Sequence, residues 1–384
     1  MKKIIFFFVG LVFVFCSCDK KSYFDVAVAY QNDVEYEEAI KYYKLAINRG
    51  EKVAVAEKNI GDIYFFKKKY EEAFEHYKNS LEIEADVALD KVIQFISYSD
   101  ESIRIFSYRL FNEIRNENSR KKMFSCLSQI LKSEEQNRVL DIIELISKIN
   151  DFTPVAEDVI KLLDKDDLII KQKVLPVLPK VAGIVVKQQY LNKVIGLLNQ
   201  DNEILKELAI DSLGNMFGWA QKSIPYLFRV AVEYPAYREK ALQAIEKIGI
   251  PTKEQVIEVF SYIKDKPVEI KVEILERLGN KRAGAKSFIP DFLLFLNDDS
   301  EEVKQVVRKS LAKIGKAIPN SVPELIELLK NKNEEIVLRA IYELGDLEHD
   351  ALQAIDSLEK ISKDKNRKES LRDAAKVSLQ KIQK

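Results

Sequence analysis

Two stretches near the C-terminal end decide the fold. Residues 289–315 read IPDFLLFLNDDSEEVKQVVRKSLAKIG, and residues 322–348 read VPELIELLKNKNEEIVLRAIYELGDLE. The second copies the first at an interval of 33 residues, so that Glu301-Glu302-Val303 becomes Glu334-Glu335-Ile336. Apolar residues recur at spacings of three and four within each helical run, which predicts a pair of amphipathic helices. Such a pair cannot bury its apolar stripe alone, so the repetition predicts a stack of neighbouring pairs.

The same unit extends upstream and downstream of this pair. An apolar residue near the end of a helix, usually followed by a small residue, marks each copy at steps of 32 to 35: Leu178, Leu213, Ile245, Leu278, Leu311, Leu344 and Leu379. Eight residues before each marker another apolar residue opens the same helix. The pattern resembles HEAT and HEAT-like repeats over roughly residues 150–384. That resemblance is specific for architecture and says little about function.

A different repeat, with a period of 34 residues, lies near the N-terminal end. Seven residues recur in register: Tyr30 as Tyr64, Tyr36 as Tyr70, Glu37-Glu38-Ala39 as Glu71-Glu72-Ala73, and Tyr43-Lys44 as Tyr77-Lys78. A small residue, Ala27 or Gly61, allows two helices to approach, and we expect the tyrosine three residues later to pack across them. The pattern resembles the tetratricopeptide repeat over residues 20–87. A third, degenerate copy is marked only by Tyr98, Ser107 and Phe111.

The first 18 residues, MKKIIFFFVGLVFVFCSC, read as an export signal. Lys2 and Lys3 precede an uncharged, mostly bulky apolar run that is shorter than the roughly 20 residues a membrane-spanning helix needs. Residues 15–18, FCSC, resemble the lipobox of bacterial lipoproteins, although a phenylalanine replaces the usual leucine and Cys16 a smaller residue. The resemblance implies cleavage before Cys18 and a lipid on its thiol. Plain secretion and an uncleaved anchor are the alternatives.

These observations predict an all-α, right-handed helical-repeat superhelix, an α-solenoid with a tetratricopeptide-like N-terminal part and a HEAT-like C-terminal part. The expected domains are a lipoprotein signal peptide (1–17), two clear and one degenerate tetratricopeptide-like repeats (18–117), a helical transition (118–150) and about seven HEAT-like repeats (151–384). Composition agrees, because 47% apolar and 32% charged residues with only 12 glycines and 10 prolines suit amphipathic helices joined by short turns.

Charge and motifs indicate a protein without catalytic chemistry. Basic and acidic residues number 61 each, so the chain lacks the basic footprint of a nucleic-acid binder. It contains only two histidines, His76 and His349, and we find no phosphate-binding glycine loop, so neither a metal nor a cofactor is expected. Acidic runs fall where helices begin and are explained by capping. With Cys16 removed and Cys18 lipidated, Cys126 is the one remaining thiol, and its apolar helical setting favours a small buried hydrophobe.

The resemblance to tetratricopeptide repeats also implies a groove for a peptide. By that resemblance it would be lined by Val28, Gln31, Asn32, Asp62 and Phe65. Because only two copies are clear, the groove is expected to be shallow.

Two further features have two interpretations each. A cation recurs in the first turn of the second helix in the HEAT-like copies: Lys171, Lys206, Arg238, Lys271, Lys304 and Arg372. We favour a ladder of ion pairs between repeats, with the acidic turns as partners, over a basic stripe that binds an acidic partner. Trp219 lies in a connection between repeats, where packing of the turn is favoured over a role as a binding anchor.

The sequence therefore predicts a non-catalytic scaffold or adaptor that holds a protein or peptide on the concave face of the solenoid. The lipid would anchor it in the bacterial cell envelope, facing the periplasm or the cell exterior. One alternative is a structural envelope protein without a discrete partner. Another is an enzyme similar to HEAT-like bilin lyases, and a third is a nucleic-acid reader similar to HEAT-like glycosylases; export opposes both, and the balanced charge further opposes the last.

Overall fold

The computed structural model describes residues 22–185 and 188–384. Within those ranges the chain is built from helices and contains no β-strand, which confirms the predicted all-α fold. The signal sequence and Cys18 lie outside the described residues. The chain divides into two compact units, one ending at Leu162 and the other beginning at Leu163, and each is described by itself.

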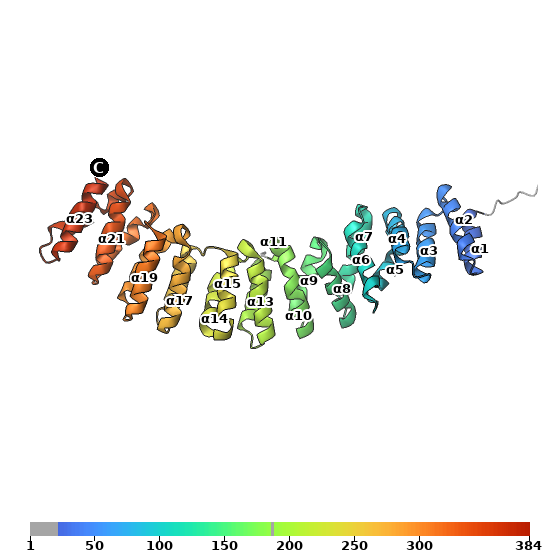
Figure 1. Ribbon diagram of the computed structural model, residues 1–384, viewed down its shortest axis with the longest axis horizontal. Coiled ribbons are helices and arrows are strands. Elements are labelled where there is room, and N and C mark those ends of the chain that lie inside the picture. The colour runs from blue at the N-terminus through green and yellow to red at the C-terminus, as the bar shows by residue number, and fades with distance from the viewer. Residues whose placement is uncertain (1–21, 186–187) are drawn as a thin grey trace, which may run out of the picture. The chain divides into compact units, whose positions relative to one another are not determined.

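The first unit is a series of antiparallel helices, drawn from blue to green in Figure 1. Its elements are α1 (Tyr23–Asn32), α2 (Tyr36–Asn48), α3 (Val53–Phe66), α4 (Tyr70–Ile83), α5 (Ala85–Ile96), α6 (Glu101–Glu113), α7 (Glu117–Leu131), α8 (Gln136–Lys148), the 3₁₀ turn η1 (Thr153–Val155) and α9 (Ala156–Lys161). Short 3₁₀ turn η2 (Leu162–Asp164) follows where the units meet in sequence. Residues 118–150, which the sequence assigns to a helical transition, fall on α7 and α8, and the division of the chain at those bounds stays a prediction.

The 34-residue repeat packs as its spacing predicts. Gly61 on α3 faces the ring of Tyr77 on α4, and a Cβ there would lie 3.1 Å from that ring. Three residues later Tyr64 stacks on His76, with ring centroids 5.5 Å apart. The equivalent pair one repeat earlier, Tyr30 and Tyr42, stacks at 5.2 Å. Small residues and aromatic stacking therefore hold each helix pair together.

The second unit contains the rest of the helices. Its elements are α10 (Leu168–Val174), η3 (Leu175–Val181), α11 (Ala182–Val185), α12 (Gln188–Gly196), η4 (Leu197–Asn199), α13 (Glu203–Asn215), η5 (Phe217–Ser223), α14 (Ile224–Glu233), η6 (Pro235–Tyr237), α15 (Arg238–Ile248), α16 (Lys253–Ile263), α17 (Val268–Gly279), η7 (Arg282–Phe288), α18 (Ile289–Leu294), η8 (Phe295–Asn297), α19 (Glu301–Ile314), η9 (Pro319–Ser321), α20 (Val322–Leu328), α21 (Glu334–Asp346), η10 (Glu348–Ala354), α22 (Ile355–Lys363) and α23 (Glu369–Ile382).

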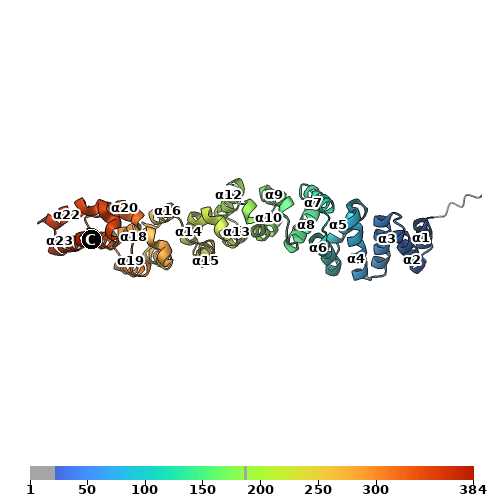
Figure 2. The same ribbon diagram turned by 90° about the horizontal axis from the view of Figure 1, so that it is seen from above.

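The helices of the second unit form two rows. The second-helix row comprises α13, α15, α17, α19, α21 and α23 and faces the viewer in Figure 1. The first-helix row comprises α12, α14, α16, α18, α20 and α22, of which α16, α20 and α22 lie along the opposite edge in Figure 2.

Close contacts between small residues hold the second-helix row together. A Cβ on Gly279 of α17 would collide with Ser310 of α19, and one on Gly345 of α21 would collide with Ser378 of α23. These glycines allow neighbouring second helices to approach more closely than larger residues would.

Connections from one repeat to the next alternate between two forms. Phe217, Arg282 and Glu348 each hold a left-handed backbone and open the 3₁₀ segments η5, η7 and η10. The two connections between them instead begin with Gly249 and Gly315, which also have positive φ. Each of the three 3₁₀ segments contacts the first helix on either side of it, as η7 contacts α16 and α18. The distances between successive first helices are therefore uneven. The candidate site between α16 and α18 lies at one of the wider intervals, beside η7.

Candidate interaction surfaces

The five predicted groove residues lie on two helices of the first unit. Val28, Gln31 and Asn32 belong to α1, whereas Asp62 and Phe65 belong to α3, and both helices pack against α2. Asn32 is exposed, and the other four are partly buried. The groove itself remains a prediction.

Gln31 and Asp62 hold tyrosine hydroxyls of the neighbouring helices. The Tyr43 hydroxyl donates to Gln31 Oε1 at 2.5 Å. The Tyr77 hydroxyl donates to Asp62 Oδ1 at 2.7 Å, and Lys58 pairs with the other carboxylate oxygen at 2.6 Å. Burial and the Asp62 carboxylate raise the pKa of Tyr77, so its hydroxyl remains a donor. These polar groups are thus fixed in place by the packing of the repeats.

Phe65 sits among aromatic residues of the next helices. Its ring stacks on Phe95 of α5 at 4.7 Å between centroids, meets Tyr98 edge-on at 5.9 Å, and lies 5.5 Å from Tyr70. The Lys91 ammonium lies 5.6 Å from the centroid of the Phe65 ring. Sequence reasoning missed Phe95 and Lys91 because α5 lies where the 34-residue pattern is worn, although the aromatic Phe95 and Tyr98 were a signal.

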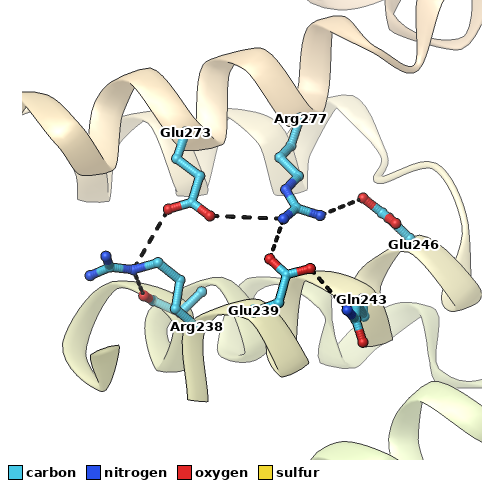
Figure 3. A network of polar contacts seen from close by, with 7 residues as sticks. Arg238, Glu239, Gln243, Glu246, Glu273 and Arg277 are labelled. Carbon is cyan, nitrogen blue, oxygen red and sulfur yellow. Dashed lines mark hydrogen bonds and ion pairs between the residues drawn. The ribbon is translucent and has the colours of Figure 1, made fainter. Parts of the chain in front are cut away.

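A network of ion pairs joins α15 and α17 on the second-helix row (Figure 3). Arg277 of α17 pairs with Glu239 and, at 2.9 Å, with Glu246, both on α15. Arg238 of α15 lies 3.8 Å from Glu273 of α17 and donates a hydrogen bond to the Ala231 carbonyl. The charges on this face therefore compensate one another between repeats.

The predicted ladder is confirmed at Lys271, whose ammonium lies 2.6 Å from Asp298 in the next acidic turn. Burial alone would raise the pKa of Asp298, but the hydrogen bond from Lys271 lowers it. At Lys206 the contact differs from the predicted ion pair with an acidic turn. That side chain is 4% exposed and places its ammonium 3.4 Å from the centroid of the Tyr234 ring, in a cation–π contact.

A groove of about 1070 Å³ opens between α16 and α18. The apolar residues of its lining include Ile257, Phe260, Leu294 and Phe295. Asp291, in the first turn of α18, also lines it. Burial raises the pKa of Asp291 to about 6 against the opposing effect of Lys253, and the buried Oδ2 atom accepts no hydrogen bond. Sequence reasoning missed this site, because Asp291 resembles any acidic residue at a helix start.

Trp219 and Cys126 agree only in part with the roles that the sequence favours, which are packing of a turn and a small buried hydrophobe. Trp219 is 59% exposed, yet its ring lies over Gly183, so it both packs on a turn and presents a surface. Cys126 is partly buried, and burial raises the pKa of its thiol, which opposes formation of the reactive thiolate.

Among the residues that the structure describes, no group of three or more His, Cys, Asp or Glu side chains is arranged to hold a metal ion. In the same part of the chain, no helix combines the length and apolar character needed to cross a membrane.

Comparison with known proteins identifies the repeats. A tetratricopeptide repeat model matches residues 20–49 and 59–87, and a HEAT repeat model matches residues 289–380. No protein of curated function matches the chain. Among solved structures, an engineered protein is similar at 13% identity and a TM-score of 0.33, covering 94% of this chain and 99% of its own. A designed armadillo repeat protein is similar at 16% identity and a TM-score of 0.27, covering 77% and 99%.

Neither similarity to a solved structure bears on function at these values. The ranges matched by the two family models fall where the 34-residue and 33-residue repeats lie in the sequence. The chain therefore carries tetratricopeptide repeats in its N-terminal part and HEAT repeats in its C-terminal part.

Proposed function

We propose that this protein is a non-catalytic scaffold that binds a protein or peptide partner and is anchored in a bacterial cell envelope by a lipid on Cys18. The single observation that carries the scaffold role is the presence of two kinds of repeat, both of which usually mediate protein interactions. Stacked helix pairs present long surfaces without a deep active site, and many weak contacts along such a surface can hold a partner.

The first unit supplies the proposed peptide groove. Its lining residues Val28, Gln31, Asn32, Asp62 and Phe65 come from α1 and α3. Support comes from the hydrogen bonds that fix Gln31 and Asp62, because side chains that are already ordered lose less entropy when a partner binds. Asn32 is the exposed member and is the one that can be modified without breaking a contact described above.

Site-specific photocrosslinking in cells tests the groove. Asn32 on α1 would be replaced by a photoreactive phenylalanine analogue, and Lys44, exposed on α2, would carry the same group as the matched control. The proposal expects one dominant partner crosslinked from position 32 and little from position 44. Equal, scattered or absent crosslinks would instead favour the structural envelope protein without a discrete partner.

The lipid anchor has its own test, because the scaffold role does not depend on it. Cells would be labelled with an alkyne-bearing fatty acid, and the protein would be compared with a Cys18→Ser variant. Label and membrane fractionation are both expected to be lost with Cys18→Ser and kept with Cys126→Ser. Label that persists in the Cys18→Ser variant would refute lipidation at this residue.

A further inference from the structure

The groove between α16 and α18 exists because the two helix rows are spaced differently at this point. On the second-helix row, Gly279 brings α17 close to α19 at Ser310. On the first-helix row, η7 lies between α16 and α18 and contacts both. Ile250, just before α16, packs over Gly284 of η7, which places this spacer near the start of α16. The groove extends away from the spacer toward the α16–α17 turn and the residues that follow α18.

The groove has apolar walls that are partly open to solvent. Ile257 of α16 is 47% exposed and Leu294 of α18 is 48% exposed, although both are large aliphatic residues. Between them the buried rings of Phe260 and Phe295 meet edge-on, with centroids 5.0 Å apart. An open groove with apolar walls has a shape that an amphipathic helix of another chain can fill.

One carboxylate in the groove lacks a compensating partner. Asp291 Oδ2 is buried and accepts no hydrogen bond. Lys253, the cation that opposes the rise in the pKa of Asp291, pairs with Glu324 of α20 at 2.5 Å. At the other end of the groove Lys271 already neutralises Asp298. The lining contains three lysines and four aspartates: Lys264, Lys266 and Lys271 against Asp265, Asp291, Asp298 and Asp299. The lining is therefore one positive charge short of balance when all four aspartates are ionised.

The geometry points to a docking site for a peptide segment that inserts apolar side chains between Ile257 and Leu294 and pairs a lysine or arginine with Asp291. An amphipathic helix meets both demands, since residues at i and i+3 or i+4 share one face and a basic residue can follow on the next turn. This site lies on the first-helix row of the second unit. It is independent of the peptide groove proposed in the first unit.

The state of Asp291 supports this assignment. A carboxyl with a raised pKa is destabilising when it ionises, and residues whose ionisation is made unfavourable by burial cluster at functional sites. Asp298 has the opposite arrangement, because Lys271 compensates its charge within the fold. A lysine or arginine of the bound peptide would stabilise the ionised Asp291 carboxylate, as Lys271 stabilises that of Asp298.

A selection with a displayed library of amphipathic helical peptides tests the site. The full chain would be the target, and enriched peptides would be measured by fluorescence polarisation against wild type, Asp291→Asn and Ile257→Asp. Two matched controls replace exposed residues elsewhere in the same unit: Glu327→Gln for charge and Val377→Asp for an exposed aliphatic residue. Circular dichroism would verify that each variant remains helical.

We expect enriched peptides to share a lysine or arginine beside two apolar positions, and to lose about tenfold or more in affinity for both groove variants. The two controls should leave the affinity unchanged. The inference is overturned if no peptide is enriched, if the basic residue is dispensable, or if Asp291→Asn binds as wild type does. Binding that depends on Asn32 and Phe65 instead would support the first-unit groove and refute this one.

Discussion

At the scale of single residues, the most strained backbone lies at Val34 in the turn between α1 and α2. Among the described residues six non-glycine positions have positive φ, and Val34, at φ 65°, is the only β-branched one. Lys68 holds the equivalent turn one repeat later, at φ 57°. A branched Cβ is poorly accommodated in the left-handed region, so this turn geometry is imposed by the packing of the helices around it.

Replacing Val34 with asparagine should therefore stabilise the first unit. Asparagine tolerates the left-handed region, and Val34 is 63% exposed, so no buried apolar contact is lost. We expect the free energy of unfolding to rise by about 1 kcal/mol, measured by urea denaturation. Lys44→Gly in the exposed middle of α2 is the control and should lower it by about 1 kcal/mol. An unchanged or lower stability for Val34→Asn would show that the turn is not strained.

Asp291 makes the stability of the second unit depend on pH. Its pKa is about 6 in the folded chain against 3.8 for a free carboxyl, so the folded state binds the proton more tightly. The associated stability is fully present below pH 3.8 and is lost as the pH rises through 6. Two pKa units correspond to about 3 kcal/mol, which solvent screening of this partly exposed group reduces to about 1–2 kcal/mol.

Asp291→Asn should accordingly be more stable than wild type at pH 7.5, with the advantage disappearing below about pH 4. Denaturation of both proteins between pH 3.5 and 8 measures this difference. Glu327→Gln, at an exposed position on α20, should show no such pH-dependent gain. If Asp291→Asn and wild type have the same free energy of unfolding at every pH, the charge of the Asp291 carboxylate is already compensated within the folded chain.

At the scale of helices, the connections in the second unit follow a period of two repeats. Left-handed residues at Phe217, Arg282 and Glu348 are spaced by 65 and 66 residues, and Gly249 and Gly315 by 66. The sequence carries this alternation: a glycine follows the helix-end marker at Leu213, Leu278 and Leu344 and is absent directly after Ile245 and Leu311. A period of one repeat was sufficient to predict the helices. The uneven spacing of the first-helix row follows a period of two repeats, so the shorter period did not predict the groove.

The close contact between α17 and α19 gives a test of that spacing. Gly279→Ala would place a methyl group against Ser310 of the next repeat, and overpacking of this kind costs about 1–3 kcal/mol. Gly196→Ala, where nothing lies within 4 Å, should be neutral or slightly stabilising. Thermal unfolding followed by circular dichroism measures both. Adding Ser310→Gly should recover part of the loss, and the absence of any coupling in this double-mutant cycle would contradict the contact.

Individual partners could be predicted less well than elements, and the reason is physical. Spacing located Lys206 and Lys271 at equivalent helix positions, but only Lys271 meets an acidic turn. Lys206 instead lies beneath Tyr234, which comes from the connection before the next second helix and has no fixed place in the periodic pattern. Likewise, the sequence placed Gln31 and Asp62 on a groove wall. It did not predict that tyrosine hydroxyls donate hydrogen bonds to them, because those bonds depend on how two helices pack. Periodicity specifies the face of a helix, and packing decides which groups meet.

At the scale of the whole molecule, the chain consists of two compact units whose stabilities should respond separately to mutation. Contacts in a repeat protein link neighbours in sequence, so the effect of a local defect fades within a few repeats. Hydrogen exchange read by mass spectrometry can report each unit in one sample, because protection depends on local opening.

Gly279→Ala should therefore reduce protection in peptides from α17 and α19 while leaving α2 to α4 unchanged. Gly61→Ala provides the reciprocal control, since its Cβ would lie 3.1 Å from the Tyr77 ring in the first unit. It should reduce protection in α3 and α4 and spare α17 and α19. Equal losses in both units from either variant would mean that the chain opens as one cooperative body, and that a partner bound to either unit would stabilise the other.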